Sequence, residues 1–345
     1  MTDRLHVVVA TPLSDDNLAL LRRLEPRLDV VHDAELTGPA SDDWMAHFER
    51  PAALQPAYEE YVDSAEALYG VPDQSGRALA RTVAANPRLR WVHTIPAGGG
   101  QQIRAARLDR AALDRILFTT SAGVHAEPLS EFAVFGVLAG AKLLPWMLEA
   151  QRRHEWAPRR VMPIASDLTV AIVGLGSIGR TTAAKLAGLG YRVVGVHRRP
   201  VEVPGVSEVF GVDRLAEVAG FADALVLALP KTDETEKMLS REVLAGAKPG
   251  ITIVNVGRGT TVDEPALIDA LADGRIGLAV LDVTYSEPLA SDSPLWDLPN
   301  VVIAPHTAAI SPHEPRLITE LFADNARRLL DGEELRNRVD TVEFY

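Results

Sequence analysis

Cysteine is absent from the whole chain of 345 residues. Its absence excludes disulfide bonds, thiolate metal ligands and cysteine nucleophiles, and it is consistent with a reducing compartment. We expect no metal site. Long apolar runs are also missing: none is long enough to span a bilayer, and Met1–Arg4 leads into a charged segment rather than a signal peptide. We therefore expect a cytoplasmic protein that binds no membrane.

A concentrated positive charge is missing as well. The formal net charge is −12, and the arginine pairs at 152–153, 159–160 and 198–199 are too local to follow a nucleic-acid backbone. We therefore expect no nucleic-acid partner. Internal repeats and low-complexity linkers are lacking too, yet the chain is longer than one hydrophobic core usually serves, so two domains are expected.

The first 120 residues alternate short apolar runs with helical segments. We predict a helix at Ser14–Leu24, capped by Ser14 or Asp15. The predicted strands are Leu5–Ala10, Leu28–Val31, Ala65–Tyr69, Leu89–Thr94 and Ile116–Thr120. The segment AEALY at 65–69 has a composition that suits a helix as well. The alternation predicts a small α/β unit with its own parallel sheet.

The segment Glu127–Ala150 is predicted to begin as a long helix with almost no charge. Apolar residues lie all around it, which requires burial on more than one side. Pro145 is expected to kink or interrupt the helix, because proline removes a helical hydrogen bond. Core packing and a contact between two copies of the chain would both explain such a helix.

The stretch Thr169–Arg180 predicts dinucleotide binding. It opens with a charge-free, mostly β-branched run that indicates a buried strand. Gly174, Gly176 and Gly179 then form G-x-G-x-x-G, which combines a tight turn, backbone approach to a pyrophosphate and close packing of the next helix. A second strand, Val193–His197, follows after about 20 residues, where the residue that reads the adenosine ribose belongs. The alternative is that the glycines only permit a tight turn.

The remaining predicted strands complete a doubly wound sheet. They are Ala224–Leu229, Ile251–Asn255, Leu278–Asp282 and Val301–Ala304. We predict a dinucleotide-binding Rossmann domain at 123–307 and a smaller substrate-binding domain made of 1–122 and 308–345. The C-terminal helix Ser311–Leu330 is expected to pack back on the first unit. Two chain crossings imply a cleft with a hinge between the domains.

Three predicted strand ends carry side chains suited to an active site. Arg258, Glu287 and His306 each follow a strand of the nucleotide domain. Ligands of open α/β sheets bind outside the carboxyl ends of strands, so these residues would form an anion clamp and a carboxylate-oriented imidazole. Each alone also has an ordinary explanation, respectively a surface ion pair, a solvated loop residue and a packing histidine.

Taken together, the motifs GLGSIGR, NVGRG, LDVTYSEPL and APHTA resemble the D-2-hydroxyacid dehydrogenase family, and the similarity extends to IPAGGG and SEFAVFGVLAG. It implies a Rossmann domain with a flavodoxin-like α/β substrate domain, and hydride transfer between a nicotinamide cofactor and a 2-keto acid. It also implies that Arg258 binds the substrate carboxylate and polarises the keto oxygen. Glu287 and His306 would form the acid–base dyad, and Asp282 would hold the nicotinamide side of the cofactor.

The basic turn after the second strand of the nucleotide domain favours NADP over NAD. NAD-selective folds place an acidic residue where His197 stands, and Arg198 and Arg199 suit a 2′-phosphate. A solvated basic turn would instead leave an enzyme that tolerates both cofactors. The expected cofactor contacts are Gly174, Gly176, Ser177, Ile178, Gly179, His197, Arg198, Arg199, Leu229, Pro230, Thr235, Val256, Asp282 and His306.

The family's substrate loop matches Ala97, Gly98 and Gly99, where successive glycines form either an anion-binding nest or a plain turn. Gly100 stands where an aspartate commonly follows. The loop GVPDQ offers no arginine for a substrate phosphate, and the chain ends at Tyr345 without the regulatory domain of many phosphoglycerate enzymes. We therefore expect a small unphosphorylated 2-keto acid, such as glyoxylate or hydroxypyruvate, that is reduced to the D-2-hydroxy acid.

Two alternative functions stay open at this point, a phosphoglycerate-type dehydrogenase and a nucleotide-sensing corepressor that keeps the same fold and triad. The resemblance also implies a homodimer in which the helix at 129–144 is buried between two nucleotide domains. Trp156 matches a position that in some relatives reaches the neighbouring active site.

Overall fold

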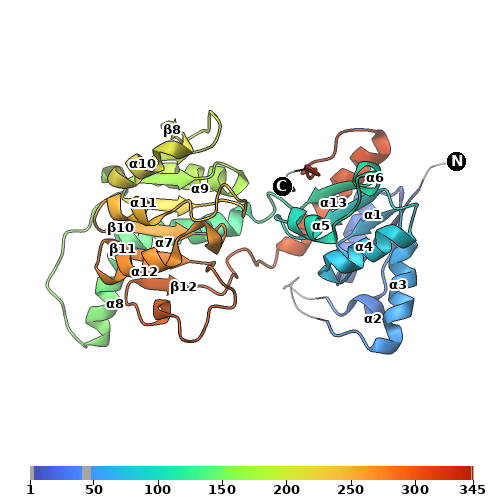
Figure 1. The fold of residues 1–345 in the computed structure, drawn as a ribbon, viewed down its shortest axis with the longest axis horizontal. Coiled ribbons are helices and arrows are strands. Elements are labelled where there is room, and N and C mark those ends of the chain that lie inside the picture. The colour runs from blue at the N-terminus through green and yellow to red at the C-terminus, as the bar shows by residue number, and fades with distance from the viewer. Residues whose placement is uncertain (1–3, 41–47, 343, 345) are drawn as a thin grey trace. The chain divides into compact units, whose positions relative to one another are not determined.

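The chain folds into two compact units (Figure 1). The structure, a computed structural model, describes residues 4–40, 48–342 and 344. Unit 1 is Met1–His125 with Ile310–Tyr345, and unit 2 is Ala126–Ala309. The ranges predicted from sequence are 1–122 with 308–345 and 123–307, of which residues 1–3, 41–47, 343 and 345 lie outside the described residues. The roles of the two units are proposals developed below.

A five-stranded parallel sheet forms the centre of unit 1. Its order, β2-β1-β3-β4-β5, is that of a flavodoxin-like doubly wound sheet, which confirms the predicted α/β unit. The strands are β1 (Leu5–Val9), β2 (Leu28–Val31), β3 (Ala67–Tyr69), β4 (Trp91–Thr94) and β5 (Leu117–Thr120). The helices are α1 (Asp15–Leu24), α2 (Ala34–Thr37), α3 (Gln55–Asp63), α4 (Gly76–Ala85), α5 (Gly100–Ala106), α6 (Arg110–Arg115) and α13 (Glu314–Asp331).

Strand β3 is shorter than the predicted segment 65–69. Its central residue, Leu68, is paired with Val8 on one side and Val92 on the other. All three residues of the strand are buried. Pairing on both sides therefore makes a strand of a sequence whose composition suits a helix equally well.

Helix α13 packs on unit 1, as predicted, although it begins at Glu314 rather than at Ser311. Phe322 stacks on Trp91 with ring centroids 4.4 Å apart. Ile318 lies in the same buried cluster. The C-terminal segment therefore supplies part of the first unit's core.

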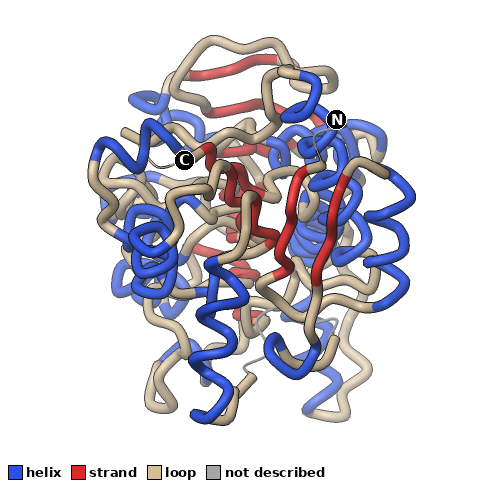
Figure 2. Tube along the Cα trace, turned by 90° about the vertical axis from the view of Figure 1, so that its right-hand side faces the viewer, coloured by secondary structure: helices blue, strands red, loops and turns tan. Residues whose placement is uncertain are grey.

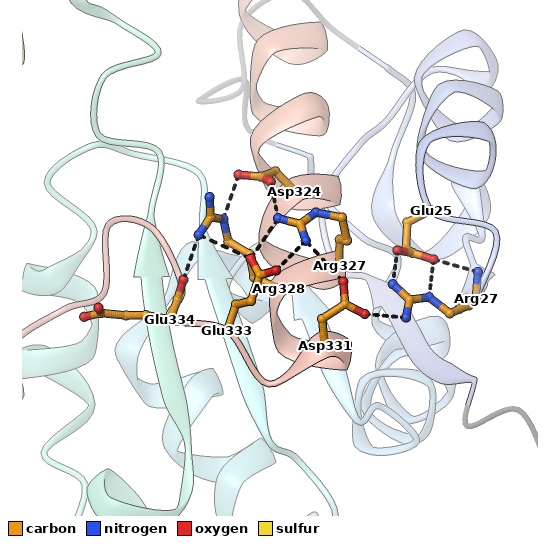
Figure 3. A network of polar contacts seen from close by, with 8 residues as sticks. All are labelled: Glu25, Arg27, Asp324, Arg327, Arg328, Asp331, Glu333 and Glu334. Atoms are coloured by element: carbon orange, nitrogen blue, oxygen red, sulfur yellow. Dashed lines mark hydrogen bonds and ion pairs between the residues drawn. The ribbon is translucent and has the colours of Figure 1, made fainter.

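Charged side chains hold the end of α13 against the start of β2 (Figure 3). Arg27 donates to both carboxylate oxygens of Glu25, at 2.8 Å and 2.7 Å, and to Asp331 Oδ1 at 2.7 Å. Glu25 is buried, and its hydrogen bond with Arg27 lowers the pKa of Glu25. The other members of the network are Asp324, Arg327, Arg328, Glu333 and Glu334.

A seven-stranded parallel sheet forms the centre of unit 2, in the order β12-β11-β10-β9-β6-β7-β8. Numbered from β6, this is the Rossmann order 3-2-1-4-5-6 with one strand added beside the sixth, which confirms the predicted doubly wound sheet. The strands are β6 (Thr169–Val173), β7 (Arg192–Val196), β8 (Glu208–Phe210), β9 (Ala224–Leu227), β10 (Ile251–Asn255), β11 (Ile276–Leu281) and β12 (Val301–Ile303). The helices, coloured blue in Figure 2, are α7 (Ala126–Ala141), α8 (Leu144–Arg152), α9 (Ser177–Gly188), α10 (Leu215–Phe221), α11 (Arg241–Gly246) and α12 (Glu264–Ala272).

Strand β8 was missed by the sequence analysis. It is three residues long, lies at the edge of the sheet beside β7, and buries only Phe210. Such a segment has no apolar run, which is the signal that predicts the buried strands.

Helix α7 lies directly against the sheet of unit 2. A Cβ at Gly140 would lie 1.9 Å from Thr252 Oγ1, and a Cβ at Gly136 would lie 2.7 Å from Val254 Cγ2. Both neighbours belong to β10. Glycine at these two positions therefore allows the helix to approach the strand.

The predicted helix 127–150 is broken into α7 and α8. Leu143, between them, has a φ of 57°, and Pro145 lies in the first turn of α8. Proline suits that position, because the first turn of a helix needs no donor from it. Among the described residues no single helix is long and apolar enough to cross a membrane, and only α7 with α8, bent by 68°, meets those criteria as a pair.

Candidate active site

The turn between β6 and α9 has the geometry that the glycine fingerprint predicts. Gly174 has a φ of 98°, which residues with a side chain rarely adopt. A Cβ at Gly179 would lie 1.9 Å from the carbonyl oxygen of Gly174, whereas one at Gly176 meets no described atom within 4 Å. The second glycine therefore leaves open space in front of α9, whose first N–H groups suit a pyrophosphate.

Loops that follow neighbouring strands approach one another closely at the carboxyl edge of this sheet. A Cβ at Gly257 would lie 2.6 Å from the carbonyl oxygen of Leu229, and a Cβ at Gly259 would lie 1.8 Å from that of Thr284. These residues follow β9, β10 and β11. The two glycines on either side of Arg258 therefore bring its loop into contact with both neighbouring loops.

His306 and Glu287 form a hydrogen-bonded pair at this edge. His306 Nδ1 lies 2.6 Å from Glu287 Oε2, and the Thr284 N–H donates to Glu287 Oε1 at 3.2 Å. The carboxylate is therefore held from two sides. The His306 side chain is 40% exposed, and its second ring nitrogen, Nε2, makes no hydrogen bond with the described residues. His306 also has a φ of 53°, a strained value of the kind found at functional sites.

The pair stabilises a protonated imidazole. The hydrogen bond to Glu287 raises the pKa of His306, and this effect exceeds the opposing effects of burial and of Arg258. Burial disfavours the ionised form of Glu287, but the bond from His306 holds the pKa of Glu287 below its usual value. A cationic imidazole that is oriented through Nδ1 can donate a proton from Nε2.

Arg258 adds a largely buried guanidinium to the same group of charges. Its Nη1 donates to the Gly257 carbonyl oxygen at 2.7 Å, and its own carbonyl oxygen accepts from Asn255 Nδ2 at 3.1 Å. Burial lowers the pKa of Arg258, and the carboxylates of Glu287 and Asp282 oppose this. The backbone of Arg258 is thus fixed, and its planar fork suits a carboxylate.

Asp282 holds the loop that carries His306. Its Oδ1 accepts from the N–H groups of Thr307 and Ala308, each at 2.9 Å, and its carbonyl oxygen accepts from the His306 N–H at 2.9 Å. Burial raises the pKa of Asp282. The sequence predicts only a cofactor contact for Asp282, and this support of the loop was missed.

A basic cluster lies beside the glycine turn. His197 Nδ1 accepts from the Leu175 N–H at 3.4 Å, which ties the end of β7 to this turn. Burial lowers the pKa of His197, and the charges of Arg198, Arg180 and Arg199 lower it further. Arg180, on α9, was missed by the sequence analysis. Three guanidinium groups therefore create a positive potential where a phosphate would be stabilised.

The other expected cofactor residues lie in loops or at the helix start on the same edge. They are Ser177 and Ile178 on α9, Leu229, Pro230 and Thr235 after β9, and Val256 after β10. The hydroxyl of Thr235 donates to the Pro230 carbonyl oxygen at 2.7 Å and accepts from the Thr232 N–H at 2.9 Å. Thr235 therefore shapes its own loop.

The predicted substrate loop belongs to unit 1, where it joins β4 to α5. A Cβ at Gly99 would lie 1.7 Å from Thr94 Oγ1, so this position requires glycine. The Gly99 N–H donates to the Pro96 carbonyl oxygen at 3.1 Å. The predicted anion nest therefore loses one of its donors, and within the loop Gly98 is exposed while Ala97 is half-buried.

The arrangement in unit 2 fits a nicotinamide dinucleotide. The open glycine turn suits the pyrophosphate, the cluster around His197 suits an additional phosphate, and the dyad lies at the other end of the strand edge. Among the described residues, no group of three or more histidine, aspartate or glutamate side chains could hold a metal ion.

Sequence similarity to known proteins extends along most of the chain. The sequence model described as "D-isomer specific 2-hydroxyacid dehydrogenase, NAD binding domain" matches residues 134–308. Glyoxylate/hydroxypyruvate reductase B of Klebsiella pneumoniae subsp. pneumoniae is 30% identical over 347 residues, covering 97% of this chain and 98% of that protein. D-3-phosphoglycerate dehydrogenase of Mycobacterium bovis is 33% identical over 266 residues, covering 76% of this chain and 49% of that protein.

A solved structure shares the fold along the whole chain. It is a D-isomer specific 2-hydroxyacid dehydrogenase from Xanthobacter autotrophicus Py2 in complex with NADPH and MES, with a TM-score of 0.79 and 30% identity. The match covers 99% of this chain and 100% of that one. By contrast, the chain spans about half the length of the phosphoglycerate dehydrogenase that it matches.

Replacing Glu287 with glutamine is expected to lower the pKa of His306. Glutamine keeps the size of the side chain but removes the charge of Glu287, which is the main cause of the raised pKa of His306. Burial and the charge of Arg258, which both lower this pKa, would then dominate. The pKa should fall from above to below the ordinary value of about 6.5. NMR titration of the His306 ring measures it, with Glu320→Gln in unit 1 as the control. An unchanged pKa would show that Glu287 does not hold the proton on His306.

Proposed function

Because the chain belongs to the D-isomer specific 2-hydroxyacid dehydrogenase family, we propose that it reduces a small unphosphorylated 2-keto acid to the D-2-hydroxy acid. It is an NAD(P)-dependent oxidoreductase. Glyoxylate and hydroxypyruvate are the first substrates to test. One observation carries the proposal: His306, whose side chain is 40% exposed, is bonded to Glu287 through Nδ1 at 2.6 Å, so that its other ring nitrogen, Nε2, is not used by this bond.

In the proposed reaction, Arg258 binds the substrate carboxylate and polarises the keto oxygen. The bound nicotinamide supplies the hydride. As negative charge develops on the keto oxygen, Arg258 and the protonated His306 stabilise it, and His306 donates its Nε2 proton. Glu287 stabilises the imidazolium before this step. Reduction should therefore slow as the pH rises through the raised pKa of His306, and oxidation should need the neutral ring.

The proposed dinucleotide site follows the strand edge of unit 2. Gly174, Gly176 and Gly179 with the first turn of α9 would hold the pyrophosphate, and Asp282 would hold the nicotinamide side. Side chains and backbone of the intervening loops would line the rest of the cofactor. These are Ser177, Ile178, Leu229, Pro230, Thr235 and Val256.

NADP is the proposed cofactor in preference to NAD. The charges of Arg198, Arg180 and Arg199 all lower the pKa of His197. His197 occupies the position at which an acidic residue would favour NAD. Guanidinium groups stabilise a 2′-phosphate through charge-assisted hydrogen bonds. The related structure from Xanthobacter autotrophicus, which contains NADPH, supports this choice.

The loop GVPDQ has no arginine of its own, but Arg50, from an earlier part of the chain, contacts it. Arg50 Nη1 donates to Asp73 Oδ1 of this loop at 2.9 Å, and the guanidinium lies 3.4 Å above the ring of Tyr58. Its Nε donates to the Leu36 carbonyl oxygen at 2.6 Å. This arginine is therefore neutralised and held by the protein, and a substrate phosphate would meet Asp73 beside it.

The experiments on activity also distinguish the proposed function from two others. The similarity to D-3-phosphoglycerate dehydrogenase favours a phosphorylated substrate, which a substrate panel separates from glyoxylate. A nucleotide-sensing corepressor would bind the cofactor without turnover.

We also propose a homodimer. Exposed apolar side chains occur on α7 and on the segment after α8: Phe135 is 45% exposed, Trp156 99%, Val161 96% and Ile164 60%. A second copy would remove this surface from water. Trp156 is proposed to reach the neighbouring active site.

Replacing His306 with alanine is expected to reduce kcat about 10²–10⁴-fold, because general acid–base help is lost. Cofactor affinity should survive. The measurement is NADPH oxidation with glyoxylate, hydroxypyruvate and 3-phosphohydroxypyruvate, together with NADPH titration by fluorescence. His6→Ala, at a half-buried position of β1 in unit 1 and outside the proposed active site, is the control. A near-normal kcat would remove His306 as the acid, and a wild-type chain that binds NADPH without reducing any 2-keto acid would favour the corepressor.

Replacing both Arg198 and Arg199 with alanine is expected to raise KM for NADPH about tenfold or more while KM for NADH changes little, because hydrogen bonds to a charged phosphate are lost. Steady-state kinetics with both cofactors measure the effect. Arg192→Ala, an exposed arginine on β7, is the control. Equal effects on both cofactors, or a wild-type preference for NADH, would show that this turn does not read the phosphate.

Replacing Trp156 and Val161 with aspartate is expected to convert the proposed dimer into a monomer, because charge would be buried in an apolar interface. Sedimentation velocity at micromolar concentration measures the mass. Val212→Asp, at another exposed apolar position of unit 2, should leave the dimer intact. A wild-type monomer would contradict the proposed assembly.

A further inference from the structure

Glu314, the first residue of α13, has a buried carboxylate with one oxygen unpaired. The residue is 2% exposed, and its Oε1 is bonded to His125 Nε2. Oε2 has no hydrogen-bond partner among the described residues. The helix dipole favours an acid at this position, but it supplies no donor to Oε2. A buried polar atom without a partner is costly and rare in native proteins, so this oxygen points to a donor that the described residues do not provide.

Glu314 also lines a cavity of about 410 Å³ in unit 1. Thr11, Tyr69 and Ile95 place this cavity at the carboxyl ends of β1, β3 and β4. The sheet places β2 on one side of β1 and β3 on the other, so the cavity lies at the topological switch point, where open α/β sheets bind ligands. A single water fills about 30 Å³, so the cavity is large enough for a small molecule.

The tyrosine in this cavity does not supply the missing donor. The Tyr69 hydroxyl lies 3.2 Å from Thr319 Oγ1, and Thr319 Oγ1 donates to the Pro315 carbonyl oxygen at 2.8 Å. Since the Thr319 proton is used, the Tyr69 proton is donated to Thr319. Burial raises the pKa of Tyr69, and the nearby Glu314 carboxylate raises it further.

The charges around the cavity favour a cation. Asp16 and Glu314 both contribute carboxylates. Arg316 also lines the cavity, but its Nε donates to Glu320 Oε1 at 2.8 Å on the exposed side of α13. An anionic ligand would meet two carboxylates, whereas a cation would satisfy the unpaired oxygen.

We propose that this cavity binds a small organic cation, an ammonium or guanidinium group on a short apolar stem, with Glu314 Oε2 as its main acceptor. Asp16, which is exposed at the rim, supplies a second carboxylate, and Leu13 and Ile318 surround the stem. Ile95 directly precedes the loop 96–99, so the cation is either the tail of a 2-keto acid, which rests on the proposed function, or a separate ligand.

Calorimetry on the full chain tests the cavity with butylammonium, and with butyrate as the anion on the same stem. Butylammonium should bind and butyrate should not. Glu314→Gln keeps an acceptor for His125 but loses the charge, and it should weaken butylammonium binding about 10- to 100-fold. Asp16→Asn, at the exposed rim, should weaken binding less, and Asp114→Asn, an exposed carboxylate on α6 that does not line the cavity, should not change it. Absent butylammonium binding, or equal binding by wild type and Glu314→Gln, would overturn the proposal.

Turnover then distinguishes the two sources of the cation. If it is a substrate tail, kcat/KM for 5-guanidino-2-oxopentanoate should exceed that for 2-oxohexanoate in the wild type, and Glu314→Gln should abolish this advantage. Glu314-dependent butylammonium binding without such an advantage assigns the cavity to a separate ligand. If the chain reduces glyoxylate but does not bind butylammonium, only the proposed cation site is contradicted. If it binds butylammonium but reduces no 2-keto acid, only the proposed function is contradicted.

Discussion

The candidate active site depends on how closely the loops after β9, β10 and β11 approach one another. On both sides of Arg258 the nearest atoms to an added Cβ are backbone atoms, at 2.6 Å for Gly257 and 1.8 Å for Gly259. A side chain at either position would displace the loop of Arg258 or the loop beside it. That neighbour is the loop of Leu229 for Gly257, and for Gly259 it is the loop that begins at Thr284 and carries Glu287. Charged groups fixed on packed backbone need little reordering when negative charge develops nearby, which is the condition for strong electrostatic stabilisation.

Much of this arrangement could be predicted because parallel strands leave a simple signal in the sequence. A strand buried on both faces is an apolar run, so the segments 169–173 and 251–255 coincide with β6 and β10. The carboxyl ends of parallel strands share one edge, which converts positions along the chain into proximity in space. The hydrogen bond between Glu287 and His306 agrees with that argument, although their catalytic roles remain proposals.

The supporting contacts could not be predicted, because each depends on a loop conformation or on a partner far away in the chain. The bonds from Thr307 and Ala308 to Asp282 require a particular turn after β12. His125 and Glu314 are 189 positions apart, and each has an ordinary local explanation. The apolar run that predicts the other strands is also missing from β8, whose stability comes from pairing with β7 rather than from its own burial.

The electrostatic potential is positive around His197 in unit 2 and negative around Tyr69 in unit 1. In unit 2, after burial, the charges of Arg198, Arg180 and Arg199 lower the pKa of His197, which is the effect of a positive potential. In unit 1, after burial, the carboxylate of Glu314 raises the pKa of Tyr69, which is the effect of a negative potential. A phosphate is stabilised by the first field and repelled by the second. Under the proposed function, recognition of a phosphate on the cofactor and rejection of one on the substrate would therefore depend on different residues, and either could change by substitution without altering the dyad.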